Sequence, residues 1–176
     1  EIEAVTGVQT CALPIYSYVM LKTKKLDFHI CTSMTFELTK NGETIKPIVT
    51  LNEGEKYVSN TVSVDCYKND ELIIYKYVAN TSSRYYKIPE LIKITRELAS
   101  IAKKDGFGML LEEQSKAWSE KWRESDIVIK GDVSAQQGIR FNIFQLNQTY
   151  TGEDYRLNIG PKGFTGEKYG DRKSVV

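Results

Sequence analysis

The sequence predicts an α+β chain in which strands come first and helices follow. Up to Ser82, hydrophobic and polar residues alternate, as they do on a strand whose side chains point in turn to opposite faces. After Pro89, hydrophobic residues recur every three or four positions, as on one side of a helix. Strands followed by helices are typical of an α+β domain or of two consecutive domains.

The strand-rich part reads as roughly four or five short antiparallel strands. The clearest alternation is VSNTVSVDC, residues 58–66, which fits a half-buried strand. LIIYKYVA, residues 72–79, is β-branched and aromatic and fits a more buried one. Asn41-Gly42 is the strongest hairpin signal, because both residues tolerate the positive φ of a tight turn. The pattern therefore predicts an antiparallel sheet or half of a sandwich.

The helical part begins with a stripe of four apolar residues: Leu91, Ile94, Leu98 and Ile101. Pro89 suits the first turn of this helix, and Gly106 suits its end. We expect a second helix over residues 109–123.

A third helix is expected to begin at SAQQ, where Ser134 and Gln137 could form a capping box. Phe141 and Phe144 lie off its main apolar stripe, so we expect this helix to be buried between other helices. The stripe itself is Ile139, Ile143, Leu146 and Tyr150.

Both ends of the chain look foreign to the rest. Residues 5–15 read VTGVQTCALPI and residues 171–176 read DRKSVV, and both strings are translations of common sequencing-library adapters. We interpret residues 1–15 and 171–176 as adapter artefact and exclude them from fold reasoning. We expect them to be exposed or poorly ordered, and the protein to be a fragment torn at both ends.

Composition excludes several classes of function. The formal net charge is +1, which indicates neither nucleic acid nor an anionic membrane as a partner. No apolar run approaches the roughly 20 residues of a membrane helix. Cys31 and Cys66 have no metal-binding spacing, and we expect both to be small buried hydrophobes. His29 is the single histidine, so no triad or histidine metal cluster is expected, and we assign it a structural role.

Residues 136–170, QQGIRFNIFQLNQTYTGEDYRLNIGPKGFTGEKYG, resemble the disaccharide phosphorylases of glycoside hydrolase family sixty-five. Within that family, IGPKGFTGEKYG looks most like the maltose phosphorylase subgroup. The stretch AWSEKWRESDIVIKGD, residues 117–132, also resembles the family's junction. The resemblance covers residues 16–170 and is strongest from Trp118 onward.

The resemblance implies a domain plan. Residues 16–82 would be the C-terminal part of an N-terminal antiparallel β-sandwich, and residues 83–131 a helical linker. Residues 132–170 would be the first helix and loop of an (α/α)6 catalytic barrel.

The resemblance also implies a reaction, inverting phosphorolysis of an α-glucosidic disaccharide with inorganic phosphate as co-substrate and no cofactor. It further implies a cytoplasmic enzyme, a homodimer at full length. Its catalytic acid and phosphate site would lie beyond residue 170, so no catalytic or metal-binding residue is assigned and the fragment should be inactive. Two alternatives stay open: a glucoamylase-type hydrolase, and a non-catalytic carbohydrate-binding β-sandwich module.

Four residues of the glycine-rich loop are the candidates for a rim that faces the sugar: Thr165, Glu167, Tyr169 and Gly170. Lys162 lacks the order GxxxxGK[ST] of a nucleotide-binding loop, and we assign it to shaping the loop.

Two other chemically suggestive groups are given structural roles. The pair Glu153-Asp154 reads as a solvated turn rather than an acid/base pair. Because they lie in the linker, Trp118 and Trp122 are expected to pack against the barrel rather than to stack on sugar.

Overall fold

The computed structural model describes residues 8–12, 16–24, 27–54, 57–149 and 152–156. The chain divides into two compact units, and each is considered by itself. We call residues 2–111 the sheet unit and residues 112–176 the helical unit. In the part of the chain that is described, no helix is long and apolar enough to cross a membrane.

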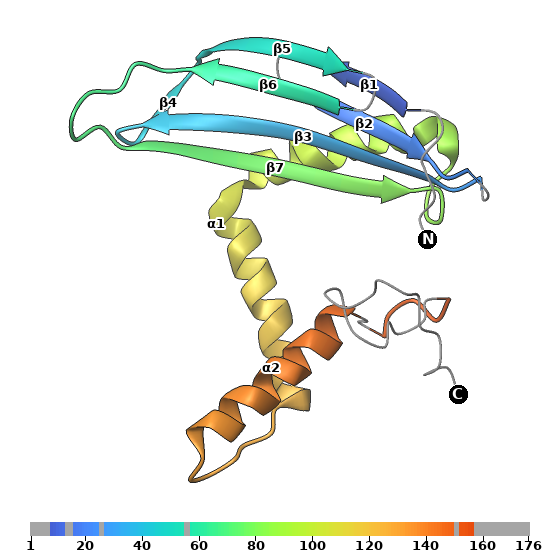
Figure 1. Cartoon of the computed structure of the whole chain (residues 1–176), viewed down its shortest axis with the longest axis vertical. Coiled ribbons are helices and arrows are strands. Elements are labelled where there is room, and N and C mark those ends of the chain that lie inside the picture. The colour runs from blue at the N-terminus through green and yellow to red at the C-terminus, as the bar shows by residue number, and fades with distance from the viewer. Residues whose placement is uncertain (1–7, 13–15, 25–26, 55–56, 150–151, 157–176) are drawn as a thin grey trace. The chain divides into compact units, whose positions relative to one another are not determined.

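A five-stranded antiparallel sheet organises the sheet unit (Figure 1). Its central strand is β3, which pairs with β2 and β4 along one edge and with β7 along the other. The outer strand β1 pairs with β2. The strands are β1 (Val8–Ala12), β2 (Ser17–Lys22), β3 (His29–Lys40), β4 (Glu43–Ile45) and β7 (Leu72–Ser82).

A two-stranded sheet lies against one face of this larger sheet. It consists of β5 (Ile48–Gly54) and β6 (Tyr57–Ser63), which pair along their full lengths. Ser17 Oγ donates to Asn60 Oδ1 at 3.1 Å across the layers. The strands are antiparallel and precede the helices, which confirms the α+β class. The complete sandwich and the barrel stay predictions, as do the domain boundaries.

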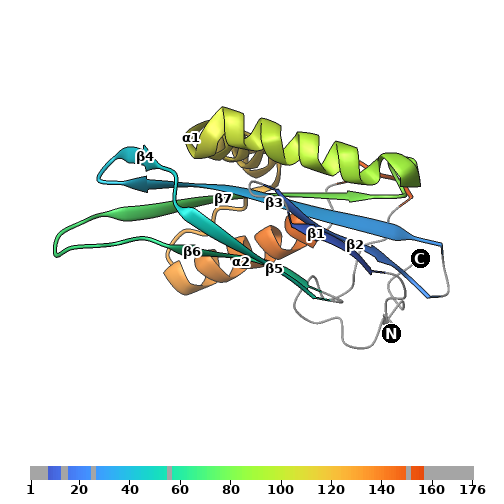
Figure 2. The ribbon, with the colours of Figure 1, turned by 90° about the horizontal axis from the view of Figure 1, so that it is seen from above.

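The first part of α1 (Leu91–Ser125) covers the opposite face of the larger sheet (Figure 2). Its buried residues are Leu91, Thr95 and Ala99. Thr81 of β7 bonds through its hydroxyl to that of Thr95. On β3, Cys31, Ser33 and Thr35 alternate onto the same side and are fully buried. Small side chains on both partners therefore let the helix approach the strands closely.

The predicted apolar stripe of this helix is wrong. Of its members, Leu91 is fully buried, whereas Leu98 is 38% and Ile101 is 54% exposed. The side that faces the sheet carries Thr95 and Ala99 instead. The reason is steric. Because the helix approaches the short side chains of β3 closely, the interface has no room for large residues, and the side of the helix with small residues packs there.

A break at Gly106 interrupts α1. This residue has φ 81° and ψ 165°, although helical hydrogen bonding continues on both sides. The prediction that the helical pattern stops at Gly106 is thus confirmed at the backbone, while the two expected helices form one interrupted element. The η1 turn (Ile88–Glu90) leads into it, with Pro89 in its first turn as expected.

The predicted hairpin at Asn41-Gly42 is confirmed, with φ of 53° and 83° at the two residues. Asn41 also bonds to the loop before β7: its amide donates to the Glu71 carbonyl at 2.8 Å, and its side-chain oxygen accepts from the Glu71 amide at 2.8 Å. The turn therefore anchors a second loop as well as reversing the chain.

The backbone of β1 bears on the interpretation of residues 1–15 as adapter. Val8–Ala12 pairs antiparallel with Ser17–Leu21 in a regular register. The expectation that this segment does not pack is therefore wrong for its backbone. The edge of β2 offers unpaired backbone groups, and these accept any extended segment within reach. Residues 13–15 and 171–176 lie outside the described residues.

In the helical unit, the end of α1 is followed by α2 (Val133–Thr149). The predicted capping box is wrong: Asp132 is the cap, and its Oδ1 accepts from the Ala135 amide at 2.9 Å. The Asp132 carboxylate lies one residue before the first helical position and is well placed to accept from this amide. Ser134 lies inside the helix and is less well placed. Phe141 is 59% and Leu146 63% exposed. The described residues therefore do not enclose α2, and its burial between other helices stays a prediction.

Candidate functional site

The four predicted rim residues, Thr165, Glu167, Tyr169 and Gly170, lie outside the residues that the structure describes, as does Lys162. Their role stays a prediction. The structure does describe the segment that leads to them: the end of α1, the connection 126–132, α2 and the turn after it. We treat this connection as the candidate functional region, because it positions the helix before the loop.

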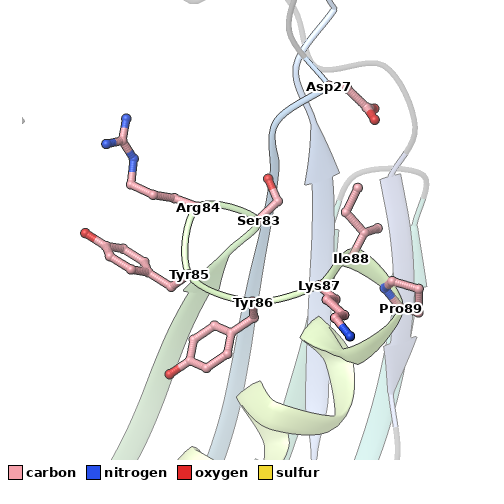
Figure 3. Close-up of a pocket in the computed structure, with 8 residues that line it drawn as sticks. All are labelled: Asp27, Ser83, Arg84, Tyr85, Tyr86, Lys87, Ile88 and Pro89. Atoms are coloured by element: carbon pink, nitrogen blue, oxygen red, sulfur yellow. The ribbon is translucent and has the colours of Figure 1, made fainter. Parts of the chain in front are cut away.

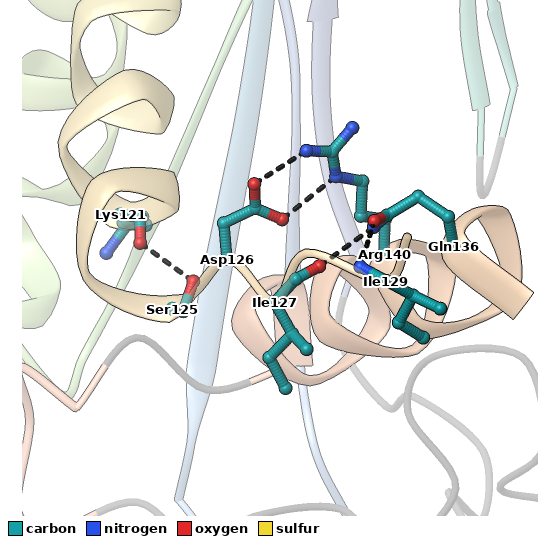
Figure 4. Close-up of polar contacts among 7 residues, drawn as sticks. All are labelled: Lys121, Ser125, Asp126, Ile127, Ile129, Gln136 and Arg140. Atoms are coloured by element: carbon teal, nitrogen blue, oxygen red, sulfur yellow. Dashed lines mark hydrogen bonds and ion pairs between the residues drawn. The ribbon is translucent and has the colours of Figure 1, made fainter. Parts of the chain in front are cut away.

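An ion pair joins the start of the connection to α2 (Figure 4). The Arg140 guanidinium on α2 donates from Nε to Asp126 Oδ1 at 2.9 Å and from Nη2 to Oδ2 at 2.6 Å. Hydrogen bonding from Arg140 lowers the pKa of the Asp126 carboxyl. Such a two-point contact fixes direction as well as distance.

Gln136 binds the middle of the connection with both atoms of its amide (Figure 4). Its Nε2 donates to the Ile127 carbonyl at 2.8 Å, and its Oε1 accepts from the Ile129 amide at 2.6 Å. The extended segment is thereby held along the first turns of α2, as a neighbouring strand would hold it.

Sequence reasoning missed both contacts. Asp126 lies in the quoted stretch 117–132, and Gln136 and Arg140 lie in the quoted stretch 136–170, but these side chains were given no role. A usable signal was present: an acidic residue just after one helix and an arginine two turns into the next can meet when the connection is short.

Aromatic rings pack α1 against α2 within the helical unit. The ring centroids of Trp118 and Phe144 are 5.0 Å apart, and those of Trp118 and Trp122 are 6.4 Å apart. This contact accounts for Phe144, which lies off the predicted stripe. It supports the interpretation of both tryptophans as packing residues.

The turn after α2 engages both members of the suggestive acidic pair. Asp154 accepts from the Arg156 amide at 3.0 Å and from its guanidinium at 2.8 Å through both oxygens. Glu153 lies 3.8 Å from Lys121 Nζ. Gly152, with φ 81°, starts the turn. Both carboxylates therefore stabilise the turn, in agreement with our interpretation of Glu153-Asp154 as turn residues.

The remaining candidates do not converge on a reaction centre. An open hollow of about 660 Å³ lies over the loop 83–89, but Arg84 and Tyr85 point away from Asp27 and Ile88 (Figure 3).

His29 is buried, with Asp27 Oδ1 at 3.8 Å from Nδ1. Cys31 is buried as expected, whereas Cys66 is exposed, contrary to expectation. Within the described ranges no group of acidic, histidine or cysteine residues could hold a metal ion.

Two family models match the chain in succession. Residues 5–121 match "Glycosyl hydrolase family 65, N-terminal domain", and residues 140–172 match "Glycosyl hydrolase family 65 central catalytic domain". The first match begins, and the second ends, within the segments that we interpreted as adapter. The predicted rim residues lie inside the second match.

Individual relatives agree with these matches. The chain is 46% identical to maltose phosphorylase of Bacillus subtilis (strain 168) over 116 residues, which are 66% of this chain and 15% of that protein. It is 30% identical to alpha,alpha-trehalose phosphorylase of Thermoanaerobacter brockii over 152 residues, 86% of this chain and 19% of that protein.

A solved structure, a putative kojibiose phosphorylase from human microbiome, superposes with a TM-score of 0.78 at 27% identity. It covers 94% of this chain, which in turn covers 21% of it. The chain thus spans about a fifth or less of the length of these relatives. Since the N-terminal-domain model alone matches more than half of its residues, the chain belongs to glycosyl hydrolase family 65.

Proposed function

We propose that this chain is part of an inverting disaccharide phosphorylase that converts maltose and phosphate to β-glucose 1-phosphate and glucose. The observation that carries the proposal is the order of the two family matches on one chain: N-terminal domain first, then the start of the catalytic domain. The similarity to a maltose phosphorylase, at 46% identity, supports maltose over the other disaccharides.

The chemistry follows from the nucleophile. An inverting glycosidase needs one carboxylic acid to protonate the leaving oxygen and a second carboxylate to activate water on the opposite face of the sugar. Phosphate is already a nucleophile at neutral pH, so a single carboxylic acid suffices. This acid and the phosphate site are proposed to lie in the catalytic domain beyond residue 170.

In this proposal the described residues position the site and the loop lines it. Asp126, Gln136 and Arg140 set the direction in which α2 leaves the connection, and α2 leads to the loop 152–170. On the loop, Thr165 and Glu167 would offer polar groups to sugar hydroxyls. Tyr169 and Gly170 would complete the rim.

The test is a phosphate-dependence assay on the full-length enzyme encoded by the complete gene. Maltose, trehalose, kojibiose and nigerose are each incubated with and without phosphate, and glucose and glucose 1-phosphate are measured. Phosphate-dependent release from maltose supports the proposal. Equal glucose release without phosphate would make the enzyme a hydrolase, and preference for trehalose would keep the phosphorylase but change its substrate.

The 176-residue chain itself serves as the matched negative control. It is expected to release no glucose 1-phosphate from maltose and phosphate, because the proposed acid is absent. Turnover by this chain would overturn the assignment of the catalytic acid to later residues.

A further inference from the structure

The turn after α2, residues 152–156, leads directly into the glycine-rich segment 157–170. Helix α2 ends at Thr149, whose hydroxyl donates to the Gln145 carbonyl at 2.7 Å. Gly152 then turns the chain with φ 81°, a value that favours glycine. Because the chain is continuous, the conformation of this turn sets where the glycine-rich segment begins.

A single carboxylate, that of Asp154, holds Arg156 at three points. Its Oδ1 accepts from the Arg156 backbone amide at 3.0 Å and from Nε at 2.8 Å, and its Oδ2 accepts from Nη2 at 2.8 Å. The Asp154 side chain is 15% exposed, so solvent screens this ion pair less than one on the open surface. A two-point contact between carboxylate and guanidinium fixes direction as well as distance. Asp154 therefore fixes both the backbone and the side chain of Arg156.

The neighbouring acid makes a much looser contact. Glu153 Oε1 lies 3.8 Å from Lys121 Nζ, and the Glu153 side chain is 79% exposed. Ion pairs exposed to this degree contribute little to stability. Two adjacent carboxylates thus differ in how tightly they hold the turn, which makes Glu153 a matched control for Asp154.

The direction of the chain at Arg156 has a consequence for binding. The candidate rim residues, from Thr165 to Gly170, follow in the same segment. If Arg156 takes up other directions, only a fraction of the molecules presents the rim to a sugar. The apparent affinity for the sugar then falls by that fraction, while the chemistry of the bound sugar stays the same.

We propose that Asp154 and Arg156 are positioning residues for disaccharide binding in the full-length enzyme. This inference rests on the proposed function, in which the segment after Arg156 lines the sugar site. Asp154 acts on Arg156, and Arg156 acts on the direction of the chain. Neither side chain is assigned a contact with sugar or phosphate.

The test is steady-state kinetics of the full-length enzyme with the disaccharide that the parent enzyme uses. Asp154→Ala is expected to raise the KM for that disaccharide about tenfold and to keep kcat within about twofold. Asp154→Asn keeps an acceptor for the Arg156 amide, so its KM should rise less. Glu153→Ala should change neither constant.

The split between KM and kcat separates positioning from stability. Partial unfolding lowers kcat in proportion to the folded enzyme that is lost, and it leaves KM unchanged. A lower kcat at unchanged KM in Asp154→Ala, or an equal rise of KM in Glu153→Ala, would overturn the proposal.

A double variant tests whether the two residues act through one contact. Arg156→Ala alone should raise the disaccharide KM by less than Asp154→Ala, because the backbone amide keeps its acceptor. The variant that carries both changes should match Asp154→Ala alone, since the guanidinium has no carboxylate left to bind. If the two increases multiply, Arg156 acts independently of Asp154 and the proposal is wrong.

Failure of the proposed function is read separately, from the parent enzyme. It appears as glucose release without phosphate or as preference for a disaccharide other than maltose. The ratio of KM between variant and parent is measured with whichever disaccharide the parent prefers, so neither result alters the test of Asp154 and Arg156.

Discussion

Lys40 at the end of β3 and Asp70 before β7 form an ion pair, with Nζ 2.8 Å from Oδ2. The same ammonium donates to the Asp65 carbonyl at 2.7 Å and lies 5.2 Å from the centre of the Tyr67 ring. Asp70 also accepts from the Asn41 side chain and from the Tyr67 amide. The pair thus joins the hairpin turn to the long loop between the two sheets.

We expect this pair to make the sheet unit sensitive to acid. Hydrogen bonds from Lys40 and Asn41 lower the pKa of Asp70 in the folded chain. The stabilisation is therefore fully present above the ordinary carboxyl pKa of about 3.9 and is lost as pH falls through the lower, folded value. Thermal unfolding followed by far-ultraviolet circular dichroism should show that Asp70→Asn is less stable than the parent at pH 7 and approaches it below pH ~3.

Glu71→Gln is the matched control for this prediction, since Glu71 is the neighbouring acid and its exposed side chain lies in the same loop. Its unfolding temperature should follow that of the parent at every pH. If Asp70→Asn and Glu71→Gln behave alike, general charge and not the Lys40 contact governs the acid response.

Gln136→Ala should destabilise the helical unit by about 1–2 kcal/mol, because two hydrogen bonds to the connection are lost. The adjacent Gln137→Ala is a matched control, since Gln137 is exposed. The chain's two tryptophans, Trp118 and Trp122, both lie in this unit, so tryptophan fluorescence during urea unfolding reports on it. Equal effects of the two variants would contradict the role given to Gln136.

Ala99→Leu should destabilise the sheet unit by about 1–3 kcal/mol, because a larger side chain is forced into a closely packed interface. Leu98→Ala should cost less than about 1 kcal/mol, since Leu98 is 38% exposed. Urea unfolding followed by circular dichroism compares the two. If Leu98→Ala destabilises the unit more than Ala99→Leu does, the apolar stripe predicted from the sequence is the side of α1 that faces the sheet.

Removing residues 1–12 should speed amide exchange in β2 and leave exchange in β3 and β7 unchanged, because β1 contributes pairing at one outer edge. Replacing residues 8–12 with an unrelated β-forming sequence should restore protection in β2. If the replacement fails, the segment pairs through its own sequence, and its interpretation as translated adapter is wrong.

The strand-then-helix order, the turn at Asn41-Gly42 and the break at Gly106 could be predicted from the sequence, because each depends on local backbone preference. The side of α1 that faces the sheet could not, because it depends on the size of Cys31, Ser33 and Thr35 across the interface. Asp132 competed with Ser134 as the cap, and helix patterns cannot separate neighbours of similar capping strength. The contacts of Gln136 and Arg140 depend on how the connection folds back, which no periodicity records.

The interface between α1 and β3 has a thermal consequence. It consists largely of hydroxyl, thiol and methyl groups, and two of its buried oxygens, Ser33 Oγ and Thr35 Oγ1, have no hydrogen-bond partner among the described residues. Heat capacity rises on exposure of apolar surface and falls on exposure of polar surface. Separating this helix from its strand therefore changes the heat capacity little. With a small heat-capacity change, the free energy of separating the helix varies almost linearly with temperature, on cooling as on warming.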